Sequence, residues 1–322
     1  MKIGIIGCGG IAGQHLLGYK ECEDVEIAAG VDVDLQRALN VAGADHAYTS
    51  FHEMLGKEKL DAVSVCTPPK FHKDAVCAAL EAGVHVLCEK PLGFNASDAR
   101  EMMDCARRTG KLLVTAFCHR FHEPVMTAKE LIKAGKIGKV IMFRNRFGGK
   151  GDMTQVWFSD PAISGGGNLP DTSIHSIDLF RYLVGNPIKV AGAVATADSR
   201  YKVEDCCALM LQTRDGAIGM IEASWTSPGS ANVIEIYGTD GAIVVDYHQS
   251  NVRFMVAGSG EWQEQPITKP SRFVLQAQHF VDCVRNGSKP IVDAMDGLRA
   301  NEIVDAVYKF AKNSGGGWLS LE

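Results

Sequence analysis

The pattern of apolar and polar positions changes partway along the chain. In the first third, short apolar runs alternate with longer amphipathic stretches, which is typical of strand–helix–strand units. The predicted strands span residues 2–6, 25–31, 62–65, 84–88 and 112–117. The predicted helices include residues 71–82 and 97–109, each followed by a glycine that can serve as a C-cap. Repeated units of this kind predict right-handed crossovers and a parallel, doubly wound sheet.

The second part of the chain reads as an α/β domain with a large open, mainly antiparallel sheet. Its helices are expected at residues 123–134, 171–184, 272–285 and 297–312. Its strands are expected at residues 140–147, 190–196, 206–212, 217–225, 231–237 and 242–246. Hairpin-type turns at 214–216 and 239–241 favour antiparallel neighbours. Because 322 residues are also long for one domain, we predict two domains, 1–122 and 123–322.

Composition and charge narrow the class of protein. A formal net charge of −5 gives no reason to expect nucleic acid or an anionic membrane as partner. No apolar run approaches the roughly 18 residues that a membrane span needs. The ten cysteines contain no CxxC pair, so their spacing predicts no metal site. Most of them lie in apolar runs, which is typical of buried free thiols in a cytoplasmic protein.

A dinucleotide fingerprint follows the first predicted strand. It consists of Gly7, Gly9, Gly10, Ile11 and Ala12, and a helical segment comes directly after it. Glycines allow a tight turn and a close approach of phosphate to the backbone, while the helix N-terminus offers free N–H groups.

An acidic residue stands at the distance that the fingerprint requires. Asp32 ends the second predicted strand, where a carboxylate accepts hydrogen bonds from the adenosine ribose and repels a 2′-phosphate. NAD is therefore expected rather than NADP, although Arg37 lies close enough in sequence to pair with a phosphate. The alternative is that Asp32 is a solvated turn residue.

Two further strand ends add residues to the expected cofactor site. Thr67, Pro69 and His72 follow the strand 62–65, and the prolines open a rigid loop there. For His72, a surface position in an ordinary turn is an equal alternative. Glu89 and Lys90 follow the strand 84–88, at the edge where open α/β sheets bind their ligands.

A candidate acid–base group lies on the predicted helix 171–184. Asp171 and His175 are spaced i, i+4 and so share one face, and Asp178 adds a third polar group there. A histidine oriented by a carboxylate suits a general acid or base near neutral pH. The glycine triplet 165–167 before the helix is expected to allow close backbone approach to a ligand. A buried structural histidine or a metal site built on these residues are the alternatives.

Lys90 completes the expected chemistry. At the carboxyl end of a parallel strand its ammonium can stabilise a developing alkoxide. With the fingerprint upstream and Asp171 and His175 downstream, Lys90 points to a nicotinamide-dependent dehydrogenase.

On these residues the chain resembles the Gfo/Idh/MocA oxidoreductases, named for glucose–fructose oxidoreductase, inositol 2-dehydrogenase and a rhizopine-catabolism protein. The likeness covers almost the whole chain and rests on the Gly7 fingerprint, Thr67…His72, Glu89-Lys90-Pro91 and Asp171…His175. It implies an NAD(P)-binding Rossmann domain joined to a substrate-binding α/β domain whose open sheet forms homodimers or homotetramers.

The resemblance also implies residue roles. His175 takes the proton from the hydroxyl being oxidised, Lys90 polarises that oxygen, and Asp171 orients both. Arg120 is implied as a site residue, and Trp157 as a stacking surface for a sugar ring. The expected substrate is a secondary hydroxyl of a sugar, sugar derivative or cyclitol, with no metal required. Two alternatives keep the fold: a non-catalytic nucleotide-binding sensor, and a dehydrogenase of dihydrodiols or a tetrapyrrole.

Overall fold

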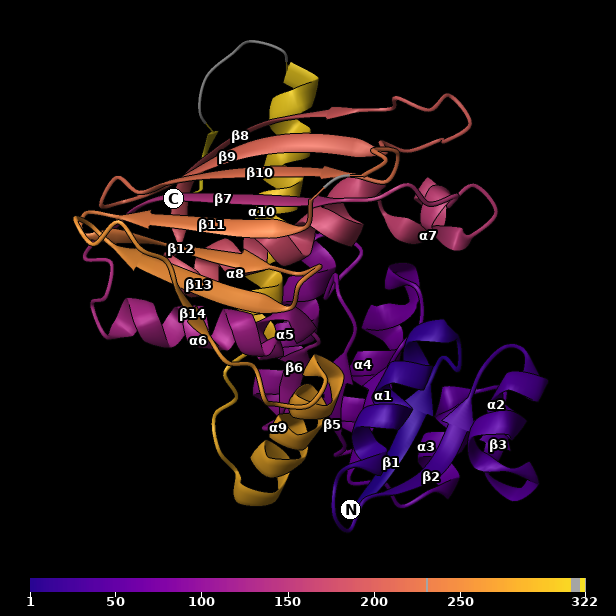
Figure 1. Cartoon of the computed structure of the whole chain (residues 1–322). Helices are drawn as coiled ribbons and strands as arrows, with labels where there is room; N and C mark the ends of the chain where they lie inside the picture. Colours follow the sequence, from indigo (N-terminus) through magenta and orange to yellow (C-terminus); the bar gives the residue numbers. More distant parts are fainter. Residues whose placement is uncertain (230, 314–318, 322) are drawn as a thin grey trace. The chain divides into compact units, whose positions relative to one another are not determined.

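The computed structural model describes residues 1–229, 231–313 and 319–321, and its backbone groups into two compact units (Figure 1). Unit 1 comprises Met1–Cys118 and Pro270–Asn301. Unit 2 comprises His119–Lys269 and the described chain from Glu302 onward. The predicted domain boundary after residue 122 stays a prediction. None of the described helices is long and apolar enough to cross a membrane.

Unit 1 contains a six-stranded sheet in the order β3-β2-β1-β4-β5-β6, and every neighbouring pair is parallel. Its strands are β1 (Lys2–Ile6), β2 (Glu26–Val31), β3 (Ala47–Tyr48), β4 (Ala62–Val65), β5 (His85–Cys88) and β6 (Leu113–Thr115). The predicted doubly wound parallel sheet is therefore confirmed. The sequence pattern missed β3, because two residues are too few to show an alternation.

Most helices of unit 1 connect these strands, and the last two come from the later part of the chain. They are α1 (Gly10–Lys20), α2 (Leu35–Ala42), α3 (Phe51–Lys57), α4 (His72–Glu81), α5 (Ala96–Thr109), α9 (Arg272–Asn286) and the first part of α10 (Ala294–Asn313). Helix α9 packs closely on α1, since a Cβ built on Gly18 would lie 2.7 Å from the carbonyl oxygen of Phe273. Glycine at this position allows the two helices to approach.

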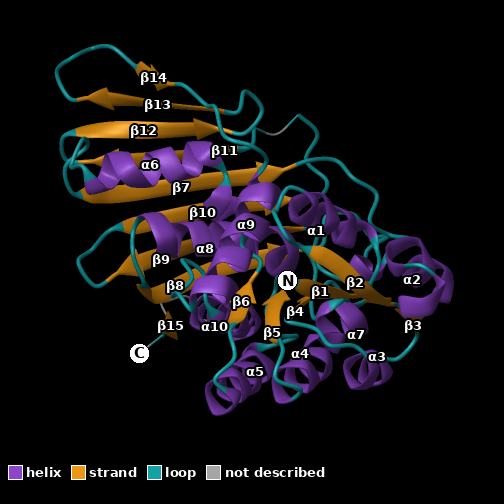
Figure 2. Cartoon of the chain, turned by 90° about the horizontal axis from the view of Figure 1, so that it is seen from below, coloured by secondary structure: helices purple, strands orange, loops and turns teal. Residues whose placement is uncertain are grey.

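Unit 2 contains a nine-stranded sheet in the order β14-β13-β12-β11-β7-β10-β9-β8-β15 (Figure 2). Its strands are β7 (Val140–Gly148), β8 (Pro187–Ala195), β9 (Cys206–Thr213), β10 (Ile218–Ser224), β11 (Val233–Gly238), β12 (Gly241–Asp246), β13 (Asn251–Val256), β14 (Gln263–Gln265) and β15 (Leu319–Ser320). Only the β7–β10 pair is parallel among the described pairings. The predicted mainly antiparallel sheet is confirmed, with more strands than the sequence pattern indicated.

Helices cover one face of this sheet. The helices of unit 2 are α6 (Glu123–Lys133), α7 (Pro161–Ser164), α8 (Ile174–Leu183) and the last part of α10. Helix α8 packs on β7 and β10, where the rings of Phe143 and Phe180 meet edge to face at 5.5 Å. Helix α6 packs on β12 and β13.

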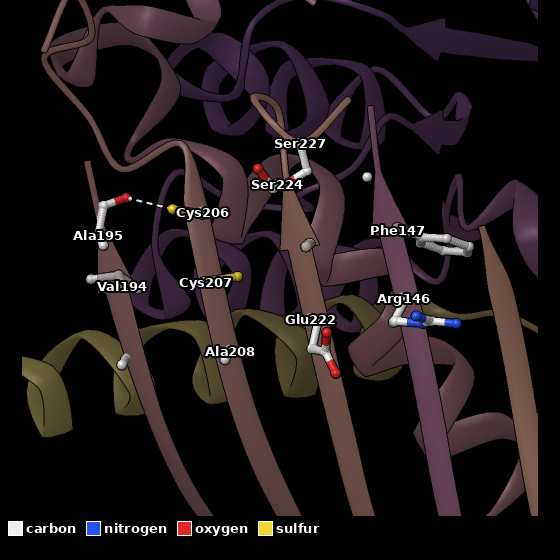
Figure 3. Close-up of a pocket in the computed structure, with 13 residues that line it drawn as sticks. Arg146, Phe147, Val194, Ala195, Cys206, Cys207, Ala208, Glu222, Ser224 and Ser227 are labelled. Atoms are coloured by element: carbon white, nitrogen blue, oxygen red, sulfur yellow. Dashed lines mark hydrogen bonds between the residues drawn. The ribbon is translucent and has the colours of Figure 1, made fainter. Parts of the chain in front are cut away.

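The other face of the sheet is open in the single chain. Met142 and Met210 point away from the helices and are 38% and 41% exposed. A hollow of about 390 Å³ lies over β7 to β10 on this unit, lined by small residues such as Ala208 and by the charged Arg146 and Glu222 (Figure 3). No described helix covers this face of the sheet, so its apolar side chains are exposed in the single chain.

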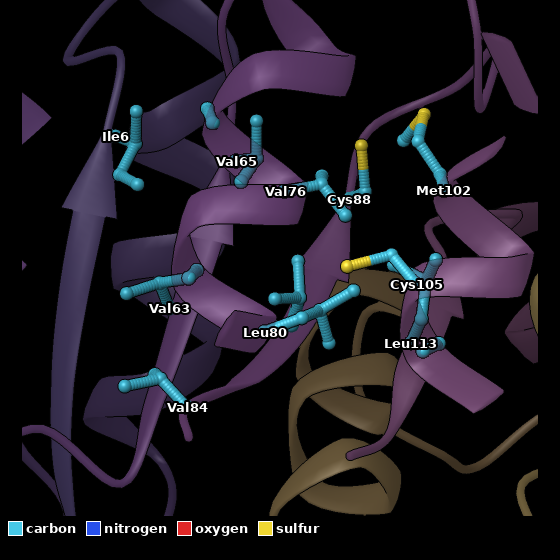
Figure 4. Close-up of a cluster of buried hydrophobic side chains, with 14 of the residues drawn as sticks. Ile6, Val63, Val65, Val76, Leu80, Val84, Cys88, Met102, Cys105 and Leu113 are labelled. Carbon is cyan, nitrogen blue, oxygen red and sulfur yellow. The ribbon is translucent and has the colours of Figure 1, made fainter. Parts of the chain in front are cut away.

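The sheet of unit 1, in contrast, carries apolar side chains on both faces. On β5, Leu87 packs in one cluster with Phe280 of α9. Its neighbours Val86 and Cys88 enter a second cluster, which Leu80 of α4 and other residues of α4 and α5 complete (Figure 4). Burial on both faces is typical of parallel sheets with helices on each side.

Candidate active site

The loop between β1 and α1 keeps its backbone accessible. Gly7 has a φ of +88°, and a Cβ there would lie 2.7 Å from the amide nitrogen of Thr67, so glycine is required. Cβ atoms built on Gly9 and Gly10 would meet no described atom within 4 Å. The first-turn N–H groups of α1 are not capped by a described side chain, and a phosphate site there stays a prediction.

Asp32 is held firmly at the end of β2. Its Oδ2 accepts a hydrogen bond from the Cys8 amide at 2.8 Å, and its Oδ1 accepts one from the Asp34 amide at 2.9 Å. Each carboxylate oxygen keeps a second lone pair for a ribose hydroxyl. Arg37 lies on the exposed surface, where its Nε is 3.4 Å from Asp34. The guanidinium thus already has a carboxylate beside it.

The burial of Ala12 and Ile11 and the state of the Thr67 hydroxyl also bear on whether this region can hold NAD. Ala12 is 1% exposed and packs in the core of unit 1, with Ile11 partly buried beside it. Thr67 Oγ1 is buried and has no hydrogen-bond partner among the described residues, although the Thr67 backbone adjoins Gly7. An open helix terminus, an anchored carboxylate and an orphaned hydroxyl fit NAD.

His72 holds the surrounding loops together. It is fully buried, and its Nε2 lies 2.8 Å from the carbonyl oxygen of Thr67. Its Nδ1 lies 3.0 Å from the carbonyl oxygen of Pro91. Burial lowers the pKa of His72 despite these carbonyl contacts. The surface position considered from the sequence is therefore wrong, and His72 can influence a cofactor only through the loops it joins. Pro69 is also buried, at the start of the 3-10 turn Pro69–Phe71.

Glu89 forms a buried ion pair with His15 of α1. His15 Nε2 donates to Glu89 Oε1 at 2.9 Å, and the two residues are 3% and 7% exposed. Burial opposes the charged imidazole, but contacts with Cys66 and Glu89 raise the pKa of His15 to about 10. Burial opposes the charged carboxylate too, yet the hydrogen bond from His15 and the nearby charges lower the pKa of Glu89.

The Glu89 carboxylate of this ion pair also holds the backbone of Lys90. The amide of Lys90 donates to Glu89 Oε2 at 3.1 Å, so the carboxylate fixes the backbone of the lysine at the end of β5. On the other side, His15 Nδ1 lies 3.0 Å from Ser64 Oγ, which also bonds to Tyr19 at 2.7 Å. The sequence pattern gave no signal for this chain of contacts, because His15 reads as an ordinary helix residue.

In unit 2, the predicted helix 171–184 begins with a wider turn. A π-helical segment, η5 (Leu169–Ser173), precedes α8 and contains Asp171, whereas His175 lies on α8. The π turn changes the hydrogen-bond pattern at the start of the predicted helix, and a shared face for Asp171 and His175 stays a prediction. Asp178 was expected on the same face as His175, but it is 1% exposed and bonds to Arg120. Turns of this type are frequent at functional sites.

Asp171 has a fixed carboxylate. The indole Nε1–H of Trp225 donates to Asp171 Oδ2 at 3.2 Å, and the Thr172 hydroxyl donates to the same oxygen at 3.2 Å. Trp225 is 5% exposed and packs with Tyr201 and Val203. Trp225 was missed from the sequence, since its position in a predicted strand suggested only a core residue.

The glycine triplet before η5 has a role different from the one predicted. A Cβ on Gly166 would overlap the hydroxyl of Tyr308, and one on Gly167 would overlap the carbonyl oxygen of Glu204. Glu204 Oε1 also accepts hydrogen bonds from the Gly167 amide at 2.9 Å and from the Tyr308 hydroxyl at 2.6 Å. The expected close approach is therefore to the protein's own residues rather than to a ligand.

His175 lies beside aromatic residues from other segments of unit 2. The ring of His119 packs on it with centroids 4.3 Å apart. The neighbouring Arg120 is 4% exposed, and its guanidinium bonds to Asp178 at 2.9 and 2.5 Å. The structure shows that the Arg120 guanidinium is paired with Asp178, and its contact with substrate stays a prediction.

Trp157 lies in the 3-10 turn η4 (Trp157–Ser159). Its ring is partly buried and stacks on Phe158 with centroids 3.8 Å apart. The loop that carries it joins β7 to α7. An aromatic surface is thus present where the sequence predicted one, and its contact with a sugar stays a prediction.

Models of one protein family match both parts of the chain. Residues 1–117 match the oxidoreductase family with an NAD-binding Rossmann fold, and residues 125–244 match the GFO/IDH/MocA C-terminal domain. The first match contains the loop with Gly7 and Asp32, together with Lys90, and the second contains Asp171 and His175.

Curated and solved proteins agree with these matches. The scyllo-inositol 2-dehydrogenase (NAD(+)) of Bacillus subtilis is 31% identical over 76% of this chain and 73% of its own. The D-apiose dehydrogenase of Paraburkholderia graminis is 26% identical over 97% of this chain and 88% of its own. The structure of aldose–aldose oxidoreductase from Caulobacter crescentus superposes with a TM-score of 0.90 at 26% identity, covering 100% of this chain and 99% of that one. The chain therefore belongs to the Gfo/Idh/MocA family and is an NAD-dependent oxidoreductase.

Proposed function

We propose that this enzyme transfers a hydride between NAD and a secondary hydroxyl of a sugar, sugar derivative or cyclitol. The observation that carries the proposal is the fixed Asp171 carboxylate on a π turn directly before the helix of His175, in a chain whose other unit fits NAD. The relatives named above are dehydrogenases of an inositol and of apiose, which supports a polyol substrate. Their names also favour an enzyme over a nucleotide-binding sensor.

Three side chains share the proposed chemistry. His175 accepts the hydroxyl proton at a ring nitrogen, as a general base does near neutral pH. The Lys90 ammonium donates a hydrogen bond to the same oxygen and stabilises the charge that develops there. Asp171 orients these groups and balances their charge. When bound, NAD supplies the ring carbon that accepts the hydride.

The remaining site residues have binding roles in this proposal. Asp32 holds the adenosine ribose, and the open first turn of α1 holds the pyrophosphate. Thr67 offers its orphaned hydroxyl to the cofactor. Trp157 offers an aromatic face to the C–H groups of a sugar ring, and Arg120 lines the substrate side.

We further propose that a second copy of the chain covers the open face of the sheet in unit 2. Exposed Met142 and Met210 supply apolar area on that face. Arg144 pairs with Glu222 at 2.9 Å on the same face, so charges of both signs are available to a symmetric partner. A reducing, cytoplasmic location suits the ten cysteines, all of which are free thiols.

The proposal is tested by following NADH formation at 340 nm with a panel of inositols, pentoses, hexoses and deoxy sugars. We expect turnover of at least one polyol with NAD. Lys90→Met and His175→Ala should each lower kcat by about 10²-fold or more, because a general acid–base group contributes that much. NAD binding, measured by calorimetry, should survive in His175→Ala.

Other results would change the assignment. Tight NAD binding without turnover of any compound would favour the sensor. Turnover of an aromatic dihydrodiol alone would move the substrate class to the second alternative. Full activity of both variants would remove Lys90 and His175 from the mechanism.

A further inference from the structure

A buried ion pair sets the position of His119 relative to His175. Arg120 and Asp178 have side chains that are 5% and 1% exposed, and two hydrogen bonds join them. Arg120 lies in the 3-10 turn η3 (Cys118–Phe121), and Asp178 lies on α8. Because a bidentate guanidinium–carboxylate pair fixes orientation as well as distance, it holds η3 against α8 in one register.

Arg120 and Asp178 each have a histidine close by in the sequence. His119 precedes Arg120, and His175 stands one helical turn before Asp178. The ion pair therefore brings the two imidazoles together, and their rings pack with centroids 4.3 Å apart and planes inclined by 40°. A ring contact of this kind limits rotation of the His175 side chain.

Tyr247, directly after β12, holds the other side of His119. Its hydroxyl and His119 Nδ1 are 3.0 Å apart, within hydrogen-bond distance. The Tyr247 ring is itself held by Phe147, which meets it edge to face at 5.0 Å, and by His122, which stacks on it at 4.5 Å. The phenol is thus fixed from two directions while it bonds to His119.

We infer that His119 and Tyr247 are positioning residues for His175. The inference rests on the proposed function, since it assigns a purpose to the orientation of the proposed base. Tyr247 fixes His119 through the hydrogen bond at Nδ1, and the His119 ring then keeps the His175 imidazole at the angle that proton transfer needs. Arg120 acts one step earlier by holding η3 on α8.

The test compares Tyr247→Phe and His119→Phe with the wild-type enzyme. Each variant keeps an aromatic ring and removes the hydrogen bond. We expect kcat for the polyol to fall about tenfold in both, as a small displacement of a catalytic group can cost up to about 10²-fold. The KM for NAD and the thermal unfolding midpoint should stay close to the wild-type values. In the double variant kcat should fall no further than in His119→Phe, because coupled residues act as one unit.

A matched control separates this effect from general damage. Tyr182→Phe removes a phenol on α8 and keeps the ring that Arg120 contacts at 5.0 Å. This control should retain kcat within about twofold. An equal fall in the control, or an additive fall in the double variant, would overturn the inference.

A readout independent of turnover keeps the two proposals distinguishable. The imidazole NMR signals of His175, assigned with His175→Ala, should shift in Tyr247→Phe and not in Tyr182→Phe. If His175→Ala abolishes turnover while Tyr247→Phe retains it and leaves these signals unchanged, only the positioning role fails. If the wild-type enzyme turns over no polyol, the proposed function fails, and the NMR comparison still decides the inference.

Discussion

At the residue scale, the clearest feature of unit 1 is a charged pair placed in its interior. Burying an imidazolium and a carboxylate costs free energy that their mutual attraction offsets only when the geometry is good. His15 and Glu89 meet this condition, with a 2.9 Å hydrogen bond and further contacts to Ser64 and to the Lys90 amide. The pair thus connects α1, which follows the loop with Gly7, with the strand end that carries Lys90.

The raised pKa of His15 predicts how stability depends on pH. The pKa is about 10 in the folded protein against an ordinary value of 6.5, so folded His15 holds a proton that the unfolded chain releases in this interval. Its contribution is complete below pH 6.5 and is lost as pH rises through 10. The free energy of unfolding should therefore fall across this range, by up to about 1.4 kcal/mol per pH unit for one proton. Urea unfolding at several pH values measures this slope.

The double variant His15→Gln/Glu89→Gln is the control for that slope. Two amides of similar volume keep the pair neutral at every pH, so the variant should lose this part of the pH dependence. The carboxylate contributes with the opposite sign, since the lowered pKa of Glu89 makes its stabilisation disappear as pH falls through that pKa. An unchanged slope in the double variant would show that other groups cause it.

At the element scale, the turn that carries Asp171 depends on how tightly the preceding loop is clamped. Glu204 bonds to the amides of Gly167 and Leu169, and Tyr308 bonds to the same carboxylate oxygen. These contacts satisfy N–H groups at the start of the π turn, which a helix otherwise leaves without partners. The clamp links the end of the chain's last described helix to the proposed active site within unit 2.

Replacement of Gly167 by alanine tests the clamp. The new Cβ would overlap the Glu204 carbonyl oxygen, so the backbone has to shift. We expect the free energy of unfolding to fall by about 1–3 kcal/mol, as overpacked sites do. Gly149→Ala is the matched control, because a Cβ there meets no described atom within 4 Å, and it should stay within about 0.5 kcal/mol of wild type. Chemical unfolding of both variants gives the comparison, and similar values would contradict the clamp.

The same elements show how far the sequence can be interpreted. Strands with strong apolar runs, such as β1, β4 and β5, were predicted within a residue or so, because burial on both faces leaves a clear signal. The π turn was not predictable, since its residues suit an ordinary helix and only the Trp225 and Glu204 contacts select the wider turn. His72 and Glu89 were assigned to the cofactor from their positions, and only the structure reveals their buried partners.

At the scale of the whole molecule, the open sheet of unit 2 makes the oligomeric state a direct test of the proposed assembly. Met210 stands opposite Met220 on neighbouring strands of that sheet and is 41% exposed. A glutamate there would place a charge in the middle of the proposed apolar interface. Met210→Glu should therefore shift the protein from dimer or tetramer to monomer in light scattering after gel filtration.

Leu17→Glu is the control for this change. Leu17 is 58% exposed on α1 of unit 1, outside the sheet proposed as the interface. Its variant should keep the wild-type mass. A wild-type protein that is already monomeric, or a Met210→Glu protein of unchanged mass, would remove the sheet from the proposed assembly.

The order of strands also affects how the chain is made by a ribosome. Strand β7 leaves the ribosome before its two neighbours in the sheet, β10 and β11. Met142 of β7 can therefore form its strand pairs only after Ile218 and Tyr237 have been synthesised. Unit 1 is likewise incomplete until Pro270–Asn301 has been synthesised and α9 can cover α1. Contacts of such long sequence separation form slowly and leave apolar strands uncovered in the meantime. Nascent chains of this protein should therefore depend on chaperones until residue 301 has been synthesised.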